Sequence, residues 1–271
     1  GGGTVVSNAL LENAKLCKTQ GKESSLRVIV CGRNRLENGS APHWAEAFAT
    51  HGKLVEVRMP QNGIRMEGIK AIADGLAKCP TLEVLDLQDN TATKTGTRSI
   101  VRHLSTWPKL RILNLSDCLL GSVGGIALAT ALSTGSNKHL EQLKLQYGEF
   151  DKRTVEILST AISQHLPKLT TLELNGNRFD AEDECVETLK KALELHGNED
   201  ALDELDDMEE VDEDEEDDDD EDEEDEDEDK DTSADDGIDA GAAGEDALPP
   251  VTKKDEDVLA DLLSKVHVQP S

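Results

Sequence analysis

Residues 82–92 read LEVLDLQDNTA, and residues 110–120, which begin 28 positions later, read LRILNLSDCLL. Both stretches place leucine at the first, fourth and sixth positions, a small polar residue at the ninth and an apolar residue at the eleventh. Self-similarity at a fixed period indicates a fold built from stacked repeats, because each repeat can bury its apolar face only against its neighbours.

The same eleven-residue pattern occurs six times in the first 180 residues. The other copies begin at residues 26, 54, 140 and 169, so successive copies start 28, 28, 28, 30 and 29 positions apart. The fifth copy has Gly148 at the ninth position, where the others carry Asn or Cys, so we expect a local irregularity there. Alternating apolar residues predict a short strand in each copy. We place these strands near 26–31, 54–59, 82–87, 110–115, 140–145 and 169–174.

A helix is expected after each strand. Apolar residues recur at helical spacing between the copies, for example Ile69, Ile72 and Leu76 within residues 66–77. A repeat of 28–30 residues with a full helix is typical of long leucine-rich repeats of the ribonuclease-inhibitor-like class. We therefore predict an α/β leucine-rich repeat solenoid, a crescent over residues 1–198, with strands on its concave face and helices on its convex face.

The first residues predict that the chain begins inside a repeat. Residues 4–16 have the pattern of a helical half, whose strand would lie before residue 1. Solenoids need capping ends. We therefore expect either that residues 1–16 are poorly ordered alone or that further repeats precede them.

The charge of the chain is concentrated near its C-terminus. The formal net charge is −30, and residues 199–231 hold 27 acidic residues and one lysine, including 18 consecutive Asp or Glu at 212–229. Because such a run repels itself and buries nothing, we predict a disordered acidic tract over 199–231 that either only solvates the chain or attracts a basic partner. Residues 203–211 also contain apolar residues, and we expect them to dock transiently.

Residues 232–271 are predicted to be a linker that ends in a short amphipathic segment. Apolar residues at helical spacing between 258 and 268 are compatible with a partner-binding segment, such as a leucine-type export signal, or with no stable structure.

Composition and motifs exclude several functions. The near-neutral repeat region argues against a nucleic-acid partner, and no run approaches the roughly 20 apolar residues of a membrane span. Five scattered cysteines indicate reduced thiols. The chain has no phosphate-binding loop, nucleophile motif or metal-ligand spacing, so we predict no cofactor, no metal and no catalysis by the chain alone. Binding of a macromolecule is the expected function.

The loop residues, in addition to the leucines, carry a family resemblance. The strings that carry it are CGRNRLENGS (31–40), QNGIRMEGI (61–69), LDLQDNTAT (85–93), LNLSDCLL (113–120), LELNGNRF (172–179) and LDELDDMEE (202–210). In these strings the chain resembles the fungal Ran GTPase-activating proteins, from its first residue into the acidic tract. This resemblance implies stimulation of GTP hydrolysis by Ran in nucleocytoplasmic transport, on the cytoplasmic side, with the nuclear envelope as a further location.

The resemblance also implies a mechanism and partners. Family members hold the switch region of GTP-bound Ran so that Ran's own glutamine orients the attacking water, aided by an asparagine of the activator and without an arginine finger. In the family that asparagine precedes the stretch that matches Gly1–Gly3, so no catalytic residue is assigned here and we expect residues 1–271 to have little activating power. Ran-binding proteins, transport receptors and a basic partner of the acidic tract are further candidates.

Loops that follow the strands supply the candidate contact residues. We favour a structural role for the asparagines at the ninth position of the pattern, which are Asn34, Asn62, Asn90 and Asn177. Arg33 and Asp89 are not required by the repeat, so a contact role is as credible as a structural one. The full set is Arg33, Asn34, Arg35, Glu37, Asn38, Asn62, Arg65, Asp89 and Asn90.

Three aromatic residues have packing roles in this interpretation. We expect Trp44 and Trp107 to pack on the helical side, and Tyr147 to pack over the position where the fifth copy lacks its asparagine.

One alternative function remains open. Acidic leucine-rich repeat proteins that bind histones as chaperones also combine repeats with an acidic tail. Their repeats are shorter and less helical than the 28–30 residues found here.

Overall fold

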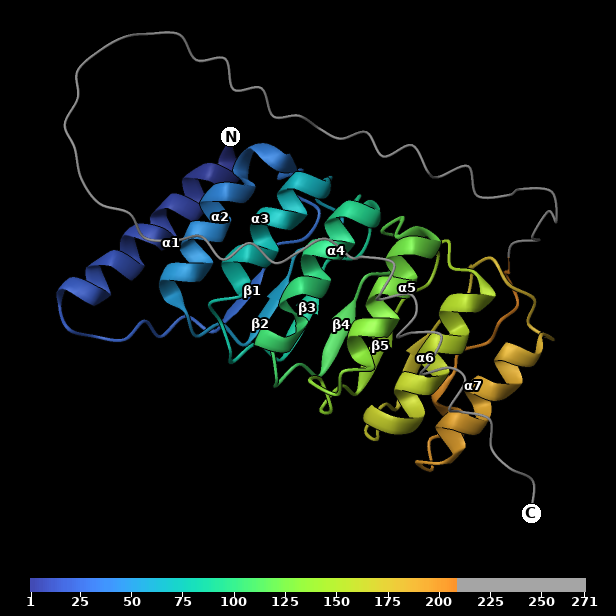
Figure 1. Ribbon diagram of the computed structural model, residues 1–271. Helices are drawn as coiled ribbons and strands as arrows, with labels where there is room; N and C mark the ends of the chain where they lie inside the picture. Colours follow the sequence, from blue (N-terminus) through green and yellow to red (C-terminus); the bar gives the residue numbers. More distant parts are fainter. Residues whose placement is uncertain (209–271) are drawn as a thin grey trace, which may run out of the picture. The chain divides into compact units, whose positions relative to one another are not determined.

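The structure, a computed structural model that describes residues 1–208, contains all six predicted repeats (Figure 1). Six parallel strands form one sheet in the order β1 to β6, and each residue pairs with the equivalent residue of the next repeat, as Val57 does with Leu85. Each strand is the centre of the predicted segment, because the chain turns away immediately afterwards. The strands are β1 Val28–Val30, β2 Glu56–Arg58, β3 Val84–Asp86, β4 Ile112–Asn114, β5 Gln142–Lys144 and β6 Thr171–Glu173.

Helices cover one face of this sheet, as the leucine-rich repeat prediction requires (Figure 1). Each helix packs against the next one in sequence, so the repeats contact only their neighbours. The helices are α1 Gly2–Thr19, α2 Glu37–His51, α3 Met66–Leu76, α4 Thr93–His103, α5 Gly121–Leu132, α6 Lys152–His165 and α7 Glu184–Glu194, with short 3₁₀ helices η1 Leu104–Thr106 and η2 Glu199–Ala201.

The core lies between the sheet and the helices. Residues at the fourth position of the pattern, such as Leu85 and Leu113, are fully buried, and so are the leucines at its first and sixth positions in the central repeats. Trp44 and Trp107 lie within this layer, which confirms their predicted packing role. Aliphatic columns that continue from repeat to repeat explain how a chain with 2% aromatic residues forms a core.

Asparagines at the ninth position connect adjacent repeats. The side-chain oxygen of Asn90 accepts hydrogen bonds from the backbone N–H groups of Asn62 and Ile64, at 3.2 and 3.0 Å. Its nitrogen donates to the carbonyls of Met59 and Leu87, at 3.0 and 2.7 Å. A longer bond from the same nitrogen reaches the carbonyl of Gln88 at 3.3 Å. Asn90 therefore bonds five backbone groups in two repeats, which confirms the structural role expected for this position.

Gly148 marks the expected irregularity, but a different aromatic residue compensates for it. A Cβ atom at Gly148 would lie 2.9 Å from the ring of Phe150, which is buried. The prediction that Tyr147 packs over this position is wrong, because its ring lies against Gly176 and its hydroxyl donates to Asp207 at 2.8 Å. Tyr147 is therefore part of the surface of the fold.

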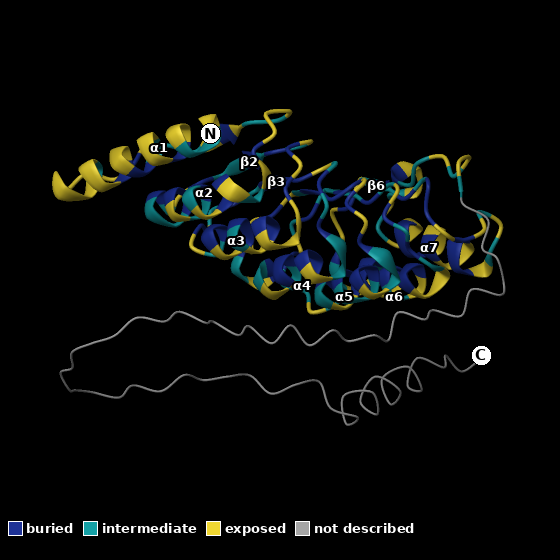
Figure 2. Ribbon diagram, turned by 90° about the horizontal axis from the view of Figure 1, so that it is seen from above, coloured by how far each residue is buried: buried dark blue, intermediate teal, exposed yellow. Residues whose placement is uncertain are grey.

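The first sixteen residues form a continuous helix, and not the poorly ordered segment that was one of our two expectations. Helix α1 packs on α2 through Leu11 and Ala14, which are buried. Most of its remaining surface is exposed, including Val5 at 70% (Figure 2).

The expectation of disorder from residue 199 differs from the structure for residues 199–208. Leu202 bridges to Leu172 of β6, and the carboxylate of Asp203 accepts hydrogen bonds from the backbone N–H groups of Leu174 and Asn175, at 2.8 and 3.2 Å. The outer edge of β6 is therefore covered by this segment. Leu205 and Met208 pack against the core, as the docking expectation for 203–211 requires.

The chain divides into two compact units, Gly1–Asp218 and Asp219–Ser271. The predictions for 209–231 and 232–271 lie outside the described residues. Within residues 1–208, no helix combines the length and apolar character needed to cross a membrane.

Candidate functional site: the post-strand edge

The loops that follow the strands form one edge of the sheet, which we call the post-strand edge (residues 31–37, 59–65, 87–93, 115–121, 145–151 and 174–183). Each loop turns sharply from strand to helix, and in each of the first five the residue at the eighth position of the pattern takes a left-handed backbone conformation, as do further residues such as Arg35 and Leu119. The eighth-position residues are Arg33, Gln61, Asp89, Asp117 and Tyr147, with φ between 52° and 60°. For a residue with a side chain this conformation costs about 1–2 kcal/mol, so the surrounding contacts must hold it.

Backbone hydrogen bonds between repeats hold these turns in place. The N–H of Asp89 donates to the carbonyl of Ser116 at 3.0 Å, and the N–H of Gln61 donates to the carbonyl of Gln88 at 2.8 Å. The buried amide of Asn90 fixes the same loops from inside. The side chains on this edge are therefore carried by rigid loops, which favours a preformed binding surface.

A hollow of about 530 Å³ lies on this edge and collects several of the predicted contact residues. Its walls come from four successive repeats, with side chains of both charges and one exposed leucine. The lining residues are Arg33, Arg35, Gln61, Asn62, Gly63, Asp89, Asn90, Thr91, Asp117 and Leu119.

The charged groups of the hollow are available to a partner. Arg33 and Arg35 are exposed, and neither guanidinium has an ion pair or side-chain hydrogen bond among residues 1–208. Asp89 is half-buried and Asp117 is exposed. The hollow therefore offers two cations in the first repeat and two carboxylates in the third and fourth.

Exposed apolar side chains accompany these charges. Met66, Leu119, Val123 and Tyr147 are between 37% and 45% exposed, and all four lie in post-strand loops or in the first turns of the following helices. Arg, Tyr and Met are enriched in protein interfaces. This mixture is suited to a folded protein partner more than to a small apolar ligand.

The other predicted contact residues lie beside the hollow. Asn38 joins two repeats, because its Nδ2 donates to Glu67 at 2.6 Å and its Oδ1 accepts from the N–H of Arg65 at 2.8 Å. Asn34 and Glu37 line a second hollow of about 510 Å³ near the start of α1.

Asn34 differs from the other ninth-position asparagines because its side chain is exposed and donates only locally, to Gly32 O at 2.6 Å and, at 3.5 Å, to the sulfur of Cys31. It therefore remains a candidate contact.

Equivalent positions in successive repeats form columns along the stack. A comparison of whole columns would have identified the lining residues of the hollow that we did not predict. Positions 33, 61, 89 and 117 are successive members of one column, and 35, 63, 91 and 119 form another. We selected Arg33 and Asp89 from the first column and left out Gln61 and Asp117. Equivalent positions in a solenoid face the same surface, so a contact role at one member predicts contact along the column.

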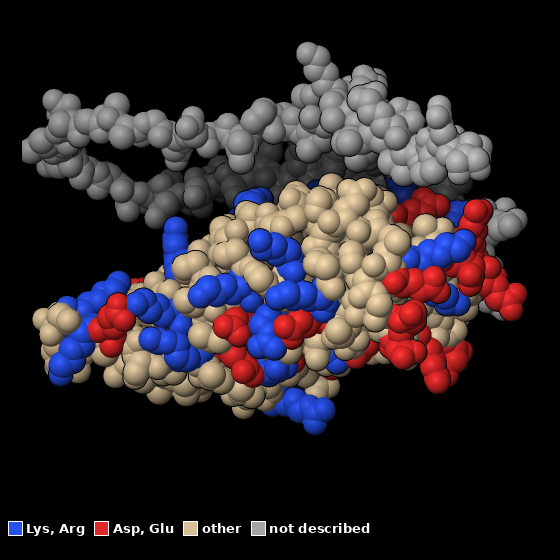
Figure 3. All heavy atoms as spheres, turned by 90° about the horizontal axis from the view of Figure 1, so that it is seen from below, with Lys and Arg blue, Asp and Glu red and all other residues tan. Residues whose placement is uncertain are grey.

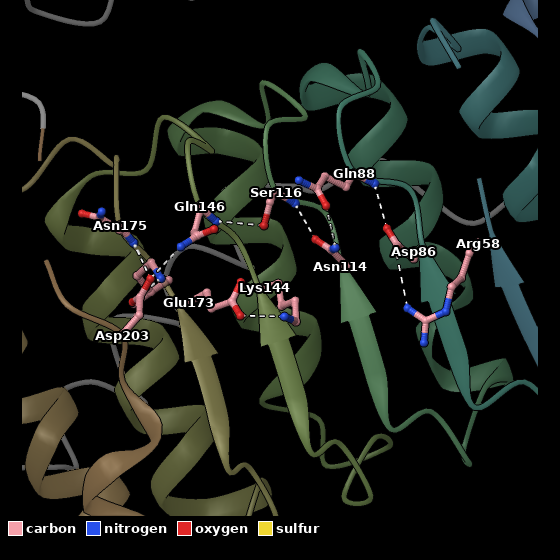
Figure 4. A network of polar contacts seen from close by, with 11 residues as sticks. Arg58, Asp86, Gln88, Asn114, Ser116, Lys144, Gln146, Glu173, Asn175 and Asp203 are labelled. Carbon is pink, nitrogen blue, oxygen red and sulfur yellow. Dashed lines mark hydrogen bonds and ion pairs between the residues drawn. The ribbon is translucent and has the colours of Figure 1, made fainter. Parts of the chain in front are cut away.

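Polar contacts on the open face of the sheet connect this edge to the C-terminal segment (Figure 4). Arg58 contacts Asp86 at 3.4 Å, and Lys144 contacts Glu173 at 2.6 Å. Gln146 donates to Asp203 at 3.0 Å. The face is thus a network of paired side chains, in contrast to the unpaired charges of the hollow.

The described residues show no catalytic or metal-binding arrangement on this edge. No group of three or more His, Cys, Asp or Glu among residues 1–208 is placed to hold a metal ion. Burial raises the pKa of the Cys118 thiol to about 12, so this thiol is not a nucleophile at neutral pH. The arrangement can bind and orient a partner.

Comparisons with known proteins agree with the fold. The family model described as "Leucine Rich repeat" matches residues 78–98 and 108–129. These segments contain β3 and β4, together with the first part of α4 and most of α5, where the pattern is most regular.

Several relatives share one name. The chain is 38% identical over 193 residues to "Ran GTPase-activating protein 1" of Saccharomyces cerevisiae, covering 69% of this chain and 47% of the yeast protein. It is 39% identical over 181 residues to "Ran GTPase-activating protein" of Drosophila melanogaster, covering 67% of this chain and 30% of the fly protein. A match to "Ran GTPase-activating protein 1" of Xenopus laevis is 50% identical over 64 residues, covering 24% of this chain and 11% of the frog protein.

The chain spans less than half the length of these three relatives. The two longer matches cover about two thirds of it and carry the same name as the resemblance found in the loops. The chain is a leucine-rich repeat protein that is similar to the Ran GTPase-activating proteins.

Proposed function

We propose that the chain is a GTPase-activating protein for Ran, acting on Ran's own hydrolysis reaction. The observation that carries this proposal is the 38% identity to the yeast protein of that name over 193 residues. The post-strand edge supports it, because its rigid loops present unpaired charges and exposed apolar residues to a protein partner.

GTP-bound Ran is the proposed partner, and the hollow is the proposed contact. A mixed surface of this kind discriminates between partners by charge complementarity, since arginines on one side and carboxylates on the other define one orientation. The exposed apolar groups would supply the buried part of the contact. Ran-binding proteins and transport receptors are further proposed partners, on the resemblance alone.

The proposed mechanism is positioning. The chain would hold the switch region so that Ran's glutamine orients the attacking water, without supplying an arginine finger. An arginine supplied in trans commonly accelerates hydrolysis by about 10³–10⁵, and a well-oriented water uses the same electrostatic and geometric preorganisation. The expectation that the assisting asparagine lies upstream of residue 1 stays a prediction.

Two measurements on the chain test this proposal separately. Affinity for Ran loaded with a non-hydrolysable GTP analogue tests the partner, and single-turnover hydrolysis of GTP by Ran tests the activation. Binding with weak stimulation supports the partner and our expectation of little activating power. Binding with full stimulation supports the activator and contradicts that expectation. Absence of binding to GTP-loaded Ran, with salt-sensitive binding to histones, would replace the proposal with the histone-chaperone alternative.

A cytoplasmic location, with the nuclear envelope as a further site, is part of the same proposal. It rests on the resemblance, and imaging of a fluorescent fusion would test it.

A further inference from the structure

The turns that precede the strands form the opposite edge of the sheet, which we call the pre-strand edge (residues 20–27, 52–55, 77–83, 104–111, 133–141 and 166–170). These turns hold eight Lys and Arg against three Glu, a net charge of +5. The post-strand loops hold four Arg against eight Asp and Glu, a net charge of −4. Every pre-strand turn carries one exposed lysine: Lys22, Lys53, Lys78, Lys109, Lys138 and Lys168.

Figure 3 views this edge from below. Lys and Arg side chains are spread over the N-terminal and central repeats, whereas Asp and Glu gather most densely over the C-terminal repeats. The six lysines therefore form a row by their equivalent repeat positions, and acidic side chains flank the C-terminal part of this row.

The three glutamates of the pre-strand turns are already paired with cations. Glu23 pairs with Lys53 at 2.5 Å, and Arg111 lies between Glu83 at 3.5 Å and Glu141 at 2.7 Å. Hydrogen bonding to Lys53 and to Arg111 lowers the pKa values of Glu23 and Glu141. These glutamates therefore have their own partners, although Glu141 also interacts electrostatically with Lys168.

Five lysines of the row form no ion pair with a carboxylate among the described residues. Lys78, Lys109 and Lys138 have no ion pair or side-chain hydrogen bond there. Lys22 contacts only Gln20, at 3.1 Å, and Lys168 contacts His139, at 3.1 Å.

Stabilisation of helix dipoles does not account for the whole row. Lys53 and Lys78 directly follow the C-cap residues Gly52 and Ala77 and are close enough to interact with the helix dipole. Lys138 lies six residues beyond the end of α5 at Leu132, outside the range of that effect.

We propose that the pre-strand edge binds an extended acidic polypeptide segment. Equivalent positions in adjacent repeats are about 5 Å apart at the strands and about 10 Å apart at the helices. In an extended chain, every second side chain recurs after about 6.6 Å on the same side. Alternate carboxylates of an acidic segment can therefore meet successive lysines of the row.

The same spacing sets the length of the ligand. Six lysines are separated by five steps, so the row spans roughly 25–50 Å, which an extended chain covers with about 8–15 residues. Shorter acidic peptides should bind progressively more weakly.

Polypeptide is favoured over nucleic acid because the edge lacks base-stacking groups. Proteins that bind single strands combine cations with exposed aromatic side chains. The single Phe, Trp or Tyr in the pre-strand turns is Trp107, which is fully buried.

A labelled peptide tests the proposal on the full chain. The probe is an 18-residue peptide with the sequence DEDEEDDDDEDEEDEDED, which is that of residues 212–229, followed by fluorescence anisotropy at low and moderate salt. The variant K78A/K109A/K138A removes three unpaired lysines of the row. The control K70A/K152A/K191A removes three exposed lysines elsewhere on the described surface and changes the net charge equally.

We expect the peptide to bind the unmodified chain at low salt and to dissociate as salt screens the charges. The row variant should bind roughly fivefold to tenfold more weakly, and the control should bind within about twofold of the unmodified chain. Carbodiimide cross-links from the peptide should map to Lys78, Lys109 or Lys138. All three proteins keep residues 209–271. Where the chain's own acidic residues compete for the row, the row variant weakens the competitor together with the peptide, so the measured ratio is a lower limit on the loss of affinity.

Three results would overturn the proposal. The first is absence of peptide binding at low salt. The second is an equal loss of affinity in the row variant and the control, which would show a response to net charge alone. The third is tighter binding of an 18-nucleotide oligothymidylate than of the peptide, lost in the row variant. The proposal does not rest on Ran, so a chain that fails to bind Ran still tests it.

Discussion

The two edges of the sheet are built from the same repeat, but they differ in backbone conformation and charge. The post-strand edge has left-handed turns held by buried asparagines such as Asn90, and its loops carry a net charge of −4. The pre-strand edge has turns that carry one lysine each and a net charge of +5. The difference fits two separate partners: a folded protein that matches the mixed charges of the post-strand edge, and an acidic segment attracted by the lysines of the pre-strand edge.

The largest expected effect is a difference in folding stability between two variants, each of which removes one buried asparagine side chain from one of the two edges. Asn90→Ala should lower the free energy of unfolding by about 3 kcal/mol, since it leaves the buried N–H groups of Asn62 and Ile64 without an acceptor and removes a donor from the carbonyls of Met59 and Leu87. Asn137→Ala, on the pre-strand edge, should cost only about 1–2 kcal/mol. Asn137 donates to Leu104 O and Trp107 O, but its own oxygen has no partner in the described structure.

Urea unfolding at one pH measures both variants. Equal losses would show that the two edges depend on their amides to the same degree, which contradicts the comparison.

A second variant tests whether the irregular fifth repeat is adapted to its glycine. Gly148→Asn restores the pattern, yet it should destabilise the fold by about 1–3 kcal/mol, because the new side chain meets the ring of Phe150. The matched control is Gly121→Asn on the same edge, where φ is +66° and a Cβ meets nothing within 4 Å. Asn tolerates this conformation, so the control should stay within about 1 kcal/mol of the parent. Thermal unfolding distinguishes them, and a stabilised Gly148→Asn would refute the adaptation.

The third prediction concerns recognition by the post-strand edge. The double variant R33A/R35A should bind GTP-loaded Ran about tenfold more weakly, because interface arginines commonly contribute 1–2 kcal/mol or more. Both side chains lie in the hollow without partners of their own in the described structure, so the fold should be unaffected. The lysine-row variant K78A/K109A/K138A serves as the control on the opposite edge. If it lost as much affinity for Ran, the two edges would not have separate partners.

The smallest effect is a pH dependence at the end of α2. His51 is buried, and burial lowers the pKa of its imidazole. The unfolded chain then binds the proton at a higher pH than the folded chain does, so stability is complete above about pH 6.5 and falls as the pH is lowered from there. His51→Gln should lose less stability than the parent between pH 7.5 and 5.5 in urea titrations. His43→Gln, on the same helix, should keep the parent's pH dependence.

Much of the fold follows from periodicity alone. A stack of repeats allows only one strand order, because each strand can pair only with the strand one period away in the sequence. The pairing of Val57 with Leu85 therefore follows from their separation of 28 residues, which is one repeat. Buried leucines and structural asparagines follow from the same pattern.

The candidate site was only partly predictable. Arg33 and Asp89 were predicted and lie in the hollow, but Gln61 and Asp117 also line it. These two were missed because neither residue stands out within its own loop. Tyr147 shows a further limit of prediction from the repeat pattern. Its hydroxyl bonds Asp207 of the C-terminal segment, 60 positions away in the sequence. That contact arises from the return of the chain over β6, which no repeat pattern encodes.

By itself, the sequence determined the α/β leucine-rich repeat architecture, the strand positions and the family resemblance, because these depend on spacing along the chain. Only the tertiary structure decided which polar side chains form hydrogen bonds within the fold and which are available to partners. Asn62 and Asn34 occupy the same repeat position, yet the first is buried with two carbonyl partners and the second is exposed. Burial depends on what the neighbouring repeat places against a side chain, and this is a property of the stack.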